Sequence, residues 1–83
     1  MVPLTDLPQG QTGLISNFRG GHRLLSRLAS LGFTPGTPVT VTRNYGFGPI
    51  IVSVRGAQVA LGRGEAGHII VHPAEGHDAF TDN

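Results

Sequence analysis

The sequence contains no cysteine and no lysine. Without cysteine the chain can form neither a disulfide framework nor a thiolate zinc site, which fits a reducing compartment. Without lysine it cannot complete a Walker A loop, in which a lysine reaches the phosphates of a bound nucleotide. If nucleotide hydrolysis accompanies the function of this protein, a partner must therefore carry it out.

Charged residues and long apolar runs are also scarce. Six arginines and five acidic residues give a formal net charge of +1, whereas nucleic-acid-binding domains concentrate basic residues in a patch. No apolar run approaches the roughly 20 residues of a spanning helix, and the N-terminus has no leader pattern. We therefore expect one cytoplasmic domain that neither binds nucleic acid nor inserts into the membrane.

Glycine and proline, by contrast, are frequent, with 13 and 6 residues spread along the chain. This distribution indicates many tight turns and is typical of a small all-β domain. In the first strand segment Leu14, Ile15 and Phe18 do not share one parity, so a bulge or a strand buried at both ends is expected. Strand patterns occupy residues 10–18, 39–42, 50–55, 59–61 and 68–71, and the segment 62–67 is expected to be a turn.

Residues 20–33, GGHRLLSRLASLGF, change to a helical period. Leu24, Leu28 and Leu31 fall on one narrow stripe at 100° per residue, which predicts one amphipathic helix of about ten residues with these leucines in the core. The predicted fold is an all-β, small five-stranded barrel with one short helix inserted between strands 1 and 2.

The end of this helix carries several stop signals. Gly32 suits the left-handed C′ position, and Phe33 can then fold back on Leu28 as in a Schellman cap. Pro35-Gly36 predicts a type II turn directly afterwards. Further along the chain, Gly56-Ala57 predicts a two-residue type II′ hairpin loop.

The segments LTDLPQGQTGLI, RLASLGFTPGTPVTV, GPIIVSVRGAQVAL and EAGHIIV together resemble the FeoA family, small cytosolic proteins of bacterial ferrous iron uptake. The resemblance runs from about Leu4 to Val71. It implies an SH3-like barrel with an inserted helix, and an accessory role beside the membrane GTPase transporter FeoB. We expect this domain to span residues 1–73 and residues 74–83 to form a flexible tail.

No motif predicts catalysis or a cofactor. Gly62, Gly64 and Gly67 spell G-x-G-x-x-G, but a dinucleotide site needs a following helix of about ten residues and a second parallel strand. Here Gly67 runs directly into His68-Ile69-Ile70-Val71. Ser26, His22 and Asp6 have the residue types of a hydrolase triad without a nucleophile elbow. We expect a protein that is not an enzyme and holds no cofactor.

A metal site is likewise not expected, although four histidines invite the question. His72 and His77, with Glu75 and Asp78, could wrap around a transition metal ion, but they lack a strong metal-ligand spacing. Binding would also have to order a flexible segment. His72 and His77 remain the only candidates for metal ligands.

The remaining function is recognition of a partner, for which we single out Arg23, Leu25, Arg27, Tyr45 and Phe47. Leu25 suits either the margin of the core or a contact patch. The two arginines form either a solvated face or a match for an acidic partner segment. The two aromatic residues either tuck under their own loop or serve as interface anchors.

These observations lead to one main hypothesis and its alternatives. The main hypothesis is a non-catalytic module that docks on a FeoB-like transporter, recruited to the inner face of the membrane. The alternatives are an SH3-like module of metal-linked transcriptional regulation, a generic peptide-binding SH3-like domain and an RNA-binding barrel. Against regulation, a repressor reads DNA with a helix-turn-helix, and only one short helix is predicted. Exposed strand edges would also allow two copies to pair.

Overall fold

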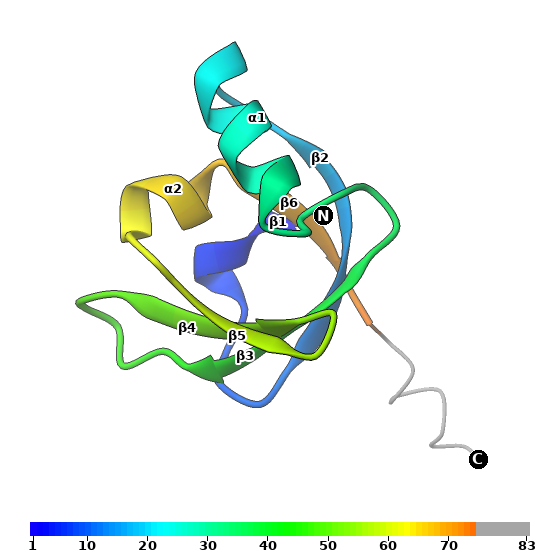
Figure 1. Ribbon diagram of the computed structural model, residues 1–83. Coiled ribbons are helices and arrows are strands. Elements are labelled where there is room, and N and C mark those ends of the chain that lie inside the picture. Colours follow the sequence, from blue (N-terminus) through cyan, green and yellow to red (C-terminus); the bar gives the residue numbers. More distant parts are fainter. Residues whose placement is uncertain (75–83) are drawn as a thin grey trace.

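All strands within the described residues 1–74 of the computed structural model belong to one antiparallel sheet, in the order β1-β6-β2-β3-β4-β5 (Figure 1). A nine-residue helix, a five-residue helix and a 3₁₀ turn lie between the strands. In chain order the elements are β1 Val2–Pro3, η1 Leu4–Asp6, β2 Thr12–Phe18, α1 His22–Ser30, β3 Pro38–Arg43, β4 Ile50–Val54, β5 Ala57–Leu61, α2 Arg63–Gly67 and β6 Ile69–Pro73.

The sheet bends around the core, with α1 above it and η1 inside the curve (Figure 1). Two shifts in register accompany the bend, one in β2 against β6 between Ile15 and Asn17 and one in β3 against β4 between Val41 and Arg43. An extra residue in one strand increases its local twist and lets the sheet curl. The bulge in β2 lets Ile15 and Phe18 face the core although they differ in parity, whereas Leu14 lies on the other face and is exposed.

The core is formed by alternating residues of the strands, together with one residue each from η1, α1 and α2 and two residues from loops. Val52 and Val54 face inward on β4 while Ser53 between them is half-buried. The N-terminal segment adds Leu4 and Leu7, which the sequence patterns do not mark as core positions. The enclosed side chains are Leu4, Leu7, Ile15, Leu28, Phe33, Val39, Val41, Ile50, Val52, Val54, Leu61, Ala66, Ile69 and Val71.

The end of α1 is the Schellman cap that the sequence predicts. Gly32 has φ +98°, its N–H donates to Ala29 O at 3.0 Å, and the Phe33 N–H donates to Leu28 O at 3.0 Å. Leu28 and Phe33 are both fully buried. The following turn is also confirmed, since Gly36 has φ +87° and the Thr37 N–H donates to Thr34 O at 3.0 Å.

The leucine stripe of α1 is enclosed less completely than its period suggests. Leu28 is fully buried, but Leu24 is half-buried and Leu31 is 38% exposed. The helix is therefore fixed to the core mainly through Leu28.

Three sequence-based expectations about elements are wrong. The sheet has six strands rather than five, because the N-terminal Val2–Pro3 pairs with β6 as β1, so the inserted helix lies between the second and third strands. The segment 62–67, expected to be a turn, contains α2. The β4–β5 loop is Arg55-Gly56 and not Gly56-Ala57, since Val54 pairs with Ala57.

The reason for the hairpin error lies in Arg55. Both loop residues have positive φ, +50° for Arg55 and +82° for Gly56, which is the type I′ geometry. A non-glycine residue at positive φ is uncommon. The Arg55 guanidinium donates to Thr34 Oγ1 at 3.3 Å and to Thr37 Oγ1 at 3.2 Å, and these tertiary contacts favour the strained backbone.

Replacing Leu28 tests its dominance in fixing α1. We expect Leu28→Ala to lower the free energy of unfolding by about 2 to 5 kcal/mol, because it opens a cavity in the core. Leu31→Ala, on the same helix face but 38% exposed, is the matched control and should cost about 1 kcal/mol or less. Urea unfolding followed by circular dichroism measures both. Equal losses in the two variants would contradict this account.

Candidate functional site

The short helix α2 connects the two parts of the predicted recognition surface. It begins after Gly62, whose N–H donates to Glu65 Oε1 at 3.3 Å, and it leads through His68 into β6. In Figure 1 it lies between α1 above and the β3–β4 loop below. Its own side chains contact both of these neighbours.

The contact with α1 is an ion pair between Arg27 and Glu65. Among residues 1–74 this is the only ion pair. The Arg27 side chain is 54% exposed and that of Glu65 29% exposed, so water screens the pair and its contribution to stability is small. The ion pair instead fixes the position of the Arg27 side chain, which it holds on the side of α1 that faces α2.

The contact with the β3–β4 loop runs through Asn44. The Arg63 guanidinium donates to Asn44 Oδ1 at 2.6 Å, and the Gly46 N–H donates to the same oxygen at 3.1 Å. The Asn44 amide nitrogen donates to Leu7 O at 3.1 Å and to Thr5 O at 3.4 Å. Asn44 thus joins α2, the η1 segment and its own loop in one network.

The β3–β4 loop presents its aromatic residues to solvent. Tyr45 is 63% exposed and Phe47 is 75% exposed, so neither tucks under the loop. The Arg43 guanidinium lies 5.7 Å from the centre of the Tyr45 ring, within cation–π range. The loop is therefore an exposed aromatic tip with a cation beside it.

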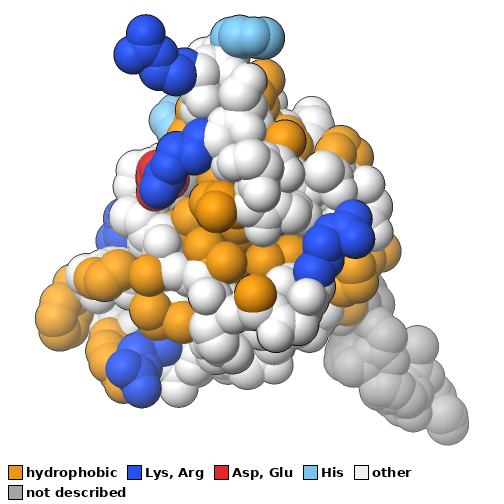
Figure 2. Space-filling model, viewed as in Figure 1, with side chains coloured by type: hydrophobic (Ala, Val, Ile, Leu, Met, Phe, Trp, Pro, Cys, Tyr) orange, Lys and Arg blue, Asp and Glu red, His pale blue; other side chains and the backbone are white. Residues whose placement is uncertain are grey.

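On α1, Arg23 is exposed and Leu25 is half-buried. Leu25 is not among the half-buried residues that pack on the core, in contrast to Leu24. In Figure 1, α1, α2 and the β3–β4 loop follow one another from the top to the lower left of the molecule, and Figure 2 shows arginine and apolar side chains along this side. The five predicted residues thus fall into two groups, on α1 and on the loop, with α2 between them.

Sequence reasoning missed Arg43, Asn44, Arg63 and Glu65 as parts of this surface. A signal for α2 was present, because Glu65 stands three residues after Gly62, the spacing of an N-cap and its N3 acid. No comparable signal marks Asn44. Its role depends on carbonyl groups of residues 5 and 7, which only the tertiary fold brings close.

The candidate metal ligands fall mostly outside the described residues. His72 is exposed on β6, opposite Leu14 of β2, while His77, Glu75 and Asp78 lie beyond residue 74. Within residues 1–74, no three His, Asp or Glu side chains lie close enough together to hold a metal ion.

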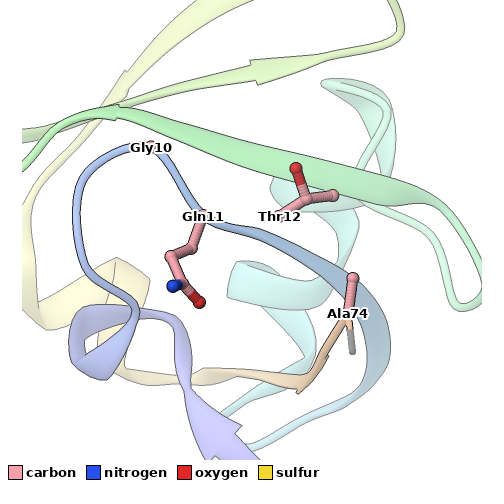
Figure 3. A pocket seen from close by; sticks show the side chains of 4 residues that line it. All are labelled: Gly10, Gln11, Thr12 and Ala74. Carbon is pink, nitrogen blue, oxygen red and sulfur yellow. The ribbon is translucent and has the colours of Figure 1, made fainter. Parts of the chain in front are cut away.

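A shallow pocket opens where β2 begins. It is lined by Gly10, Gln11, Thr12 and Ala74, the last described residue (Figure 3). The Thr12 hydroxyl is hydrogen-bonded to that of Thr40 at 2.7 Å, and the Ala74 N–H donates to Thr12 O at 2.8 Å. Among residues 1–74, no ionisable side chain lines it. In the same described region, no helix has the length and hydropathy needed to cross a membrane.

Comparison with known proteins finds relatives that are described as iron-transport or iron-uptake proteins. The model of the FeoA domain matches residues 2–73. The chain is 36% identical, over 75 residues covering 90% of each chain, to "Putative Fe(2+) transport protein A" of Methanocaldococcus jannaschii. A crystal structure described as iron uptake regulatory protein (FeoA) is 40% identical, with a TM-score of 0.83 over 88% of this chain and 97% of the other.

Two further structures widen the comparison. FeoA of Stenotrophomonas maltophilia, described as an SH3 domain protein complexed with zinc, is 25% identical with a TM-score of 0.72, over 86% of this chain and 89% of that one. A manganese-dependent transcriptional repressor is 27% identical with a TM-score of 0.80 over 87% of this chain. The matched region is 41% of that repressor, so the likeness concerns one of its parts.

Replacing Asn44 tests whether this residue holds the loop against α2. We expect Asn44→Ala to lower the free energy of unfolding by about 2 kcal/mol, because it leaves partners of Asn44 without hydrogen bonds. It should also speed hydrogen exchange of the Gly46 amide. Thr42→Ala is the matched control, since the Thr42 hydroxyl is exposed and donates its one proton to either Ile51 O or Gln58 Oε1, each 3.0 Å away. An equal effect of the two variants would refute the special role of Asn44.

Proposed function

The chain belongs to the FeoA family, and from this premise we propose that it is a non-catalytic accessory protein of ferrous iron uptake. It docks from the cytoplasmic side on a FeoB-type membrane GTPase transporter and modulates the assembly or the activity of that transporter. The observation that carries the docking proposal is the exposed aromatic tip of the β3–β4 loop. The family membership supports the link to iron transport.

The geometry of the tip suits an interface anchor. Gly46 and Gly48 have φ +91° and +73°, a backbone that turns the intervening Phe47 outward. The loop base is held by Asn44, so little conformational freedom remains to be lost when a partner binds. Large aromatic side chains that are presented in this way are typical of interface hot spots.

The charges around the tip favour an acidic partner surface. Arg43 lies beside Tyr45, and Arg23 is exposed on α1. Of the two acids in residues 1–74, Glu65 is already paired with Arg27, and Asp6 lies on η1. A partner that offers carboxylates around an apolar pocket would therefore gain both attraction during approach and burial of Phe47.

Metal-linked transcriptional regulation is a second candidate, and the likeness to manganese-dependent repressors favours it. In that case the domain would act together with a DNA-binding part, as one module of a regulator. The shared fold by itself does not distinguish the two functions, because one fold can carry many different sites.

Binding to the transporter gives the first test. We expect the soluble GTPase domain or a cytoplasmic peptide of a FeoB-type transporter to bind the chain, and Phe47→Ser to weaken that binding about 30-fold by removing an aromatic anchor. Leu14→Ser, which replaces a 44% exposed leucine on β2, should leave the affinity unchanged. Isothermal titration calorimetry provides the measurement. Equal affinities for wild type and Phe47→Ser would remove the tip from the proposal.

DNA retention separates the second candidate from the first. We expect the 83-residue chain to leave the mobility of duplex DNA unchanged with or without manganese, because its six arginines form no concentrated basic patch. A gel-shift assay at low salt checks this outcome. Retention that depends on manganese would favour the regulatory function instead.

A further inference from the structure

The two edges of the sheet differ in how well they are protected. At one edge, β1 has two residues and one of them is proline, which leaves little backbone for another chain to pair with. At the other edge, β5 extends over five residues, Ala57–Leu61, without proline or charge. Its pairing with β4 runs through all five residues with no shift in register. Proline, charged side chains and a bulge, which usually hinder strand addition, are thus absent from β5.

The free backbone groups of β5 can be assigned from its register. Val54 pairs with Ala57 across a two-residue loop, and such a closing pair is hydrogen-bonded. Hydrogen-bonded and non-bonded pairs then alternate along an antiparallel ladder. Gln58 and Ala60 therefore direct their N–H and C=O groups away from β4, and both residues are exposed.

Apolar side chains continue the surface beside this free edge. Val59 points to the core side of β5 yet is only half-buried, whereas its partner Val52 on β4 is fully buried. Ala57, on the same side, is exposed, and Leu31 at the end of α1 is 38% exposed. We call Leu31, Ala57, Val59 and the free edge of β5 the β5 strip.

Two arginine contacts join the segments that flank β5 to α1 and to the turn after it. At the start of β5, Arg55 Nε donates to Gly32 O at 3.4 Å. At its end, Arg27 is paired with Glu65 of α2. Figure 2 shows apolar side chains gathered between the helices and the β4–β5 hairpin, with arginine side chains on either side. The β5 strip is thus apolar along its length, with Arg55 at one end and Arg27, Arg63 and Glu65 at the other.

From this arrangement we propose that the β5 strip binds an extended peptide segment of a partner protein, with alternating apolar side chains and acidic residues at its ends. The segment adds to the sheet as a seventh strand next to β5, and its backbone bonds to Gln58 and Ala60. Its apolar side chains cover Val59, Ala57 and Leu31.

Charge complementarity selects a partner peptide over a second copy. The elements around the strip carry more arginines than acids, so two copies brought together here would repel each other, whereas acidic ends on a peptide would be attracted. The residues that set this charge are Arg23, Arg27, Arg55 and Arg63 against Glu65. The strip is built from β5 and the end of α1 and shares no residue with the aromatic tip. Peptide binding to the strip is therefore independent of the proposed docking function.

The test uses the full chain and a defined probe, the blocked heptapeptide Glu-Val-Ser-Val-Ser-Val-Glu. In an NMR titration we expect shifts confined to β5 and the last turn of α1, and slower hydrogen exchange of the Gln58 and Ala60 amides. A peptide with lysine at both ends should bind about tenfold more weakly, since its lysines have the same sign of charge as the arginines beside the strip and are repelled by them. Shifts elsewhere, or unchanged exchange of the two amides, would overturn the proposal.

A pair of variants at one position isolates the backbone contribution. Ala60→Pro removes an outward N–H without removing a bond to β4, and we expect it to weaken peptide binding about tenfold. Ala60→Thr keeps the N–H and should bind as the wild type does. Equal binding by Ala60→Pro and Ala60→Thr would exclude strand addition at β5.

The peptide-free protein provides the last control. Gln58 and Ala60 amides that are already protected without peptide would show that the strip has another occupant, and would overturn the assignment to a partner. Analytical ultracentrifugation then identifies that occupant. A dimer would indicate a second copy, and a monomer would indicate the chain's own residues 75–83. Rapid exchange in the free protein is the outcome that we expect.

Discussion

The reversal of the chain at Gly32 is the constraint on which the remaining structure depends. Because Gly32 takes a left-handed backbone, Phe33 folds back and both it and Leu28 become fully buried. This burial is the main contact that fixes a helix of nine residues, which is too short to be stable alone, on the curved sheet. The position of every arginine on α1 follows from it.

Three arginines then set how the surface elements lie relative to one another. Arg55 ties the β4–β5 loop to the turn after α1, Arg27 joins α1 to α2, and Arg63 joins α2 to Asn44. Each contact is modest in energy, since most of these groups are partly exposed. Together they place an aromatic tip and an unprotected strand edge on a small domain whose fold is shared with metal-dependent repressors. The binding surfaces proposed for this FeoA protein are thus built from contacts outside its core.

Much of the fold could be predicted from local patterns. The Schellman cap, the turn at Gly36 and the bulge in β2 each follow from a few neighbouring residues, and the structure contains all three. The candidate site was predicted less completely. Exposure of Tyr45 and Phe47 agrees with a contact role, but the assignment of Arg23, Leu25 and Arg27 to a partner stays a prediction. Neither α2 nor Asn44 was anticipated as the link between these groups.

The sequence by itself determined the features that depend on a few neighbouring residues. These are the strand alternation, the helix period, the cap and turn residues, and the resemblance to a family that rests on them. The tertiary structure alone decided the pairing of β1 with β6, the positive φ of Arg55 and the contacts of Asn44. The physical reason is the range of the interactions. Glycine and proline act on their own backbone, whereas a two-residue strand or a strained loop is stable only where distant segments supply its hydrogen-bond partners.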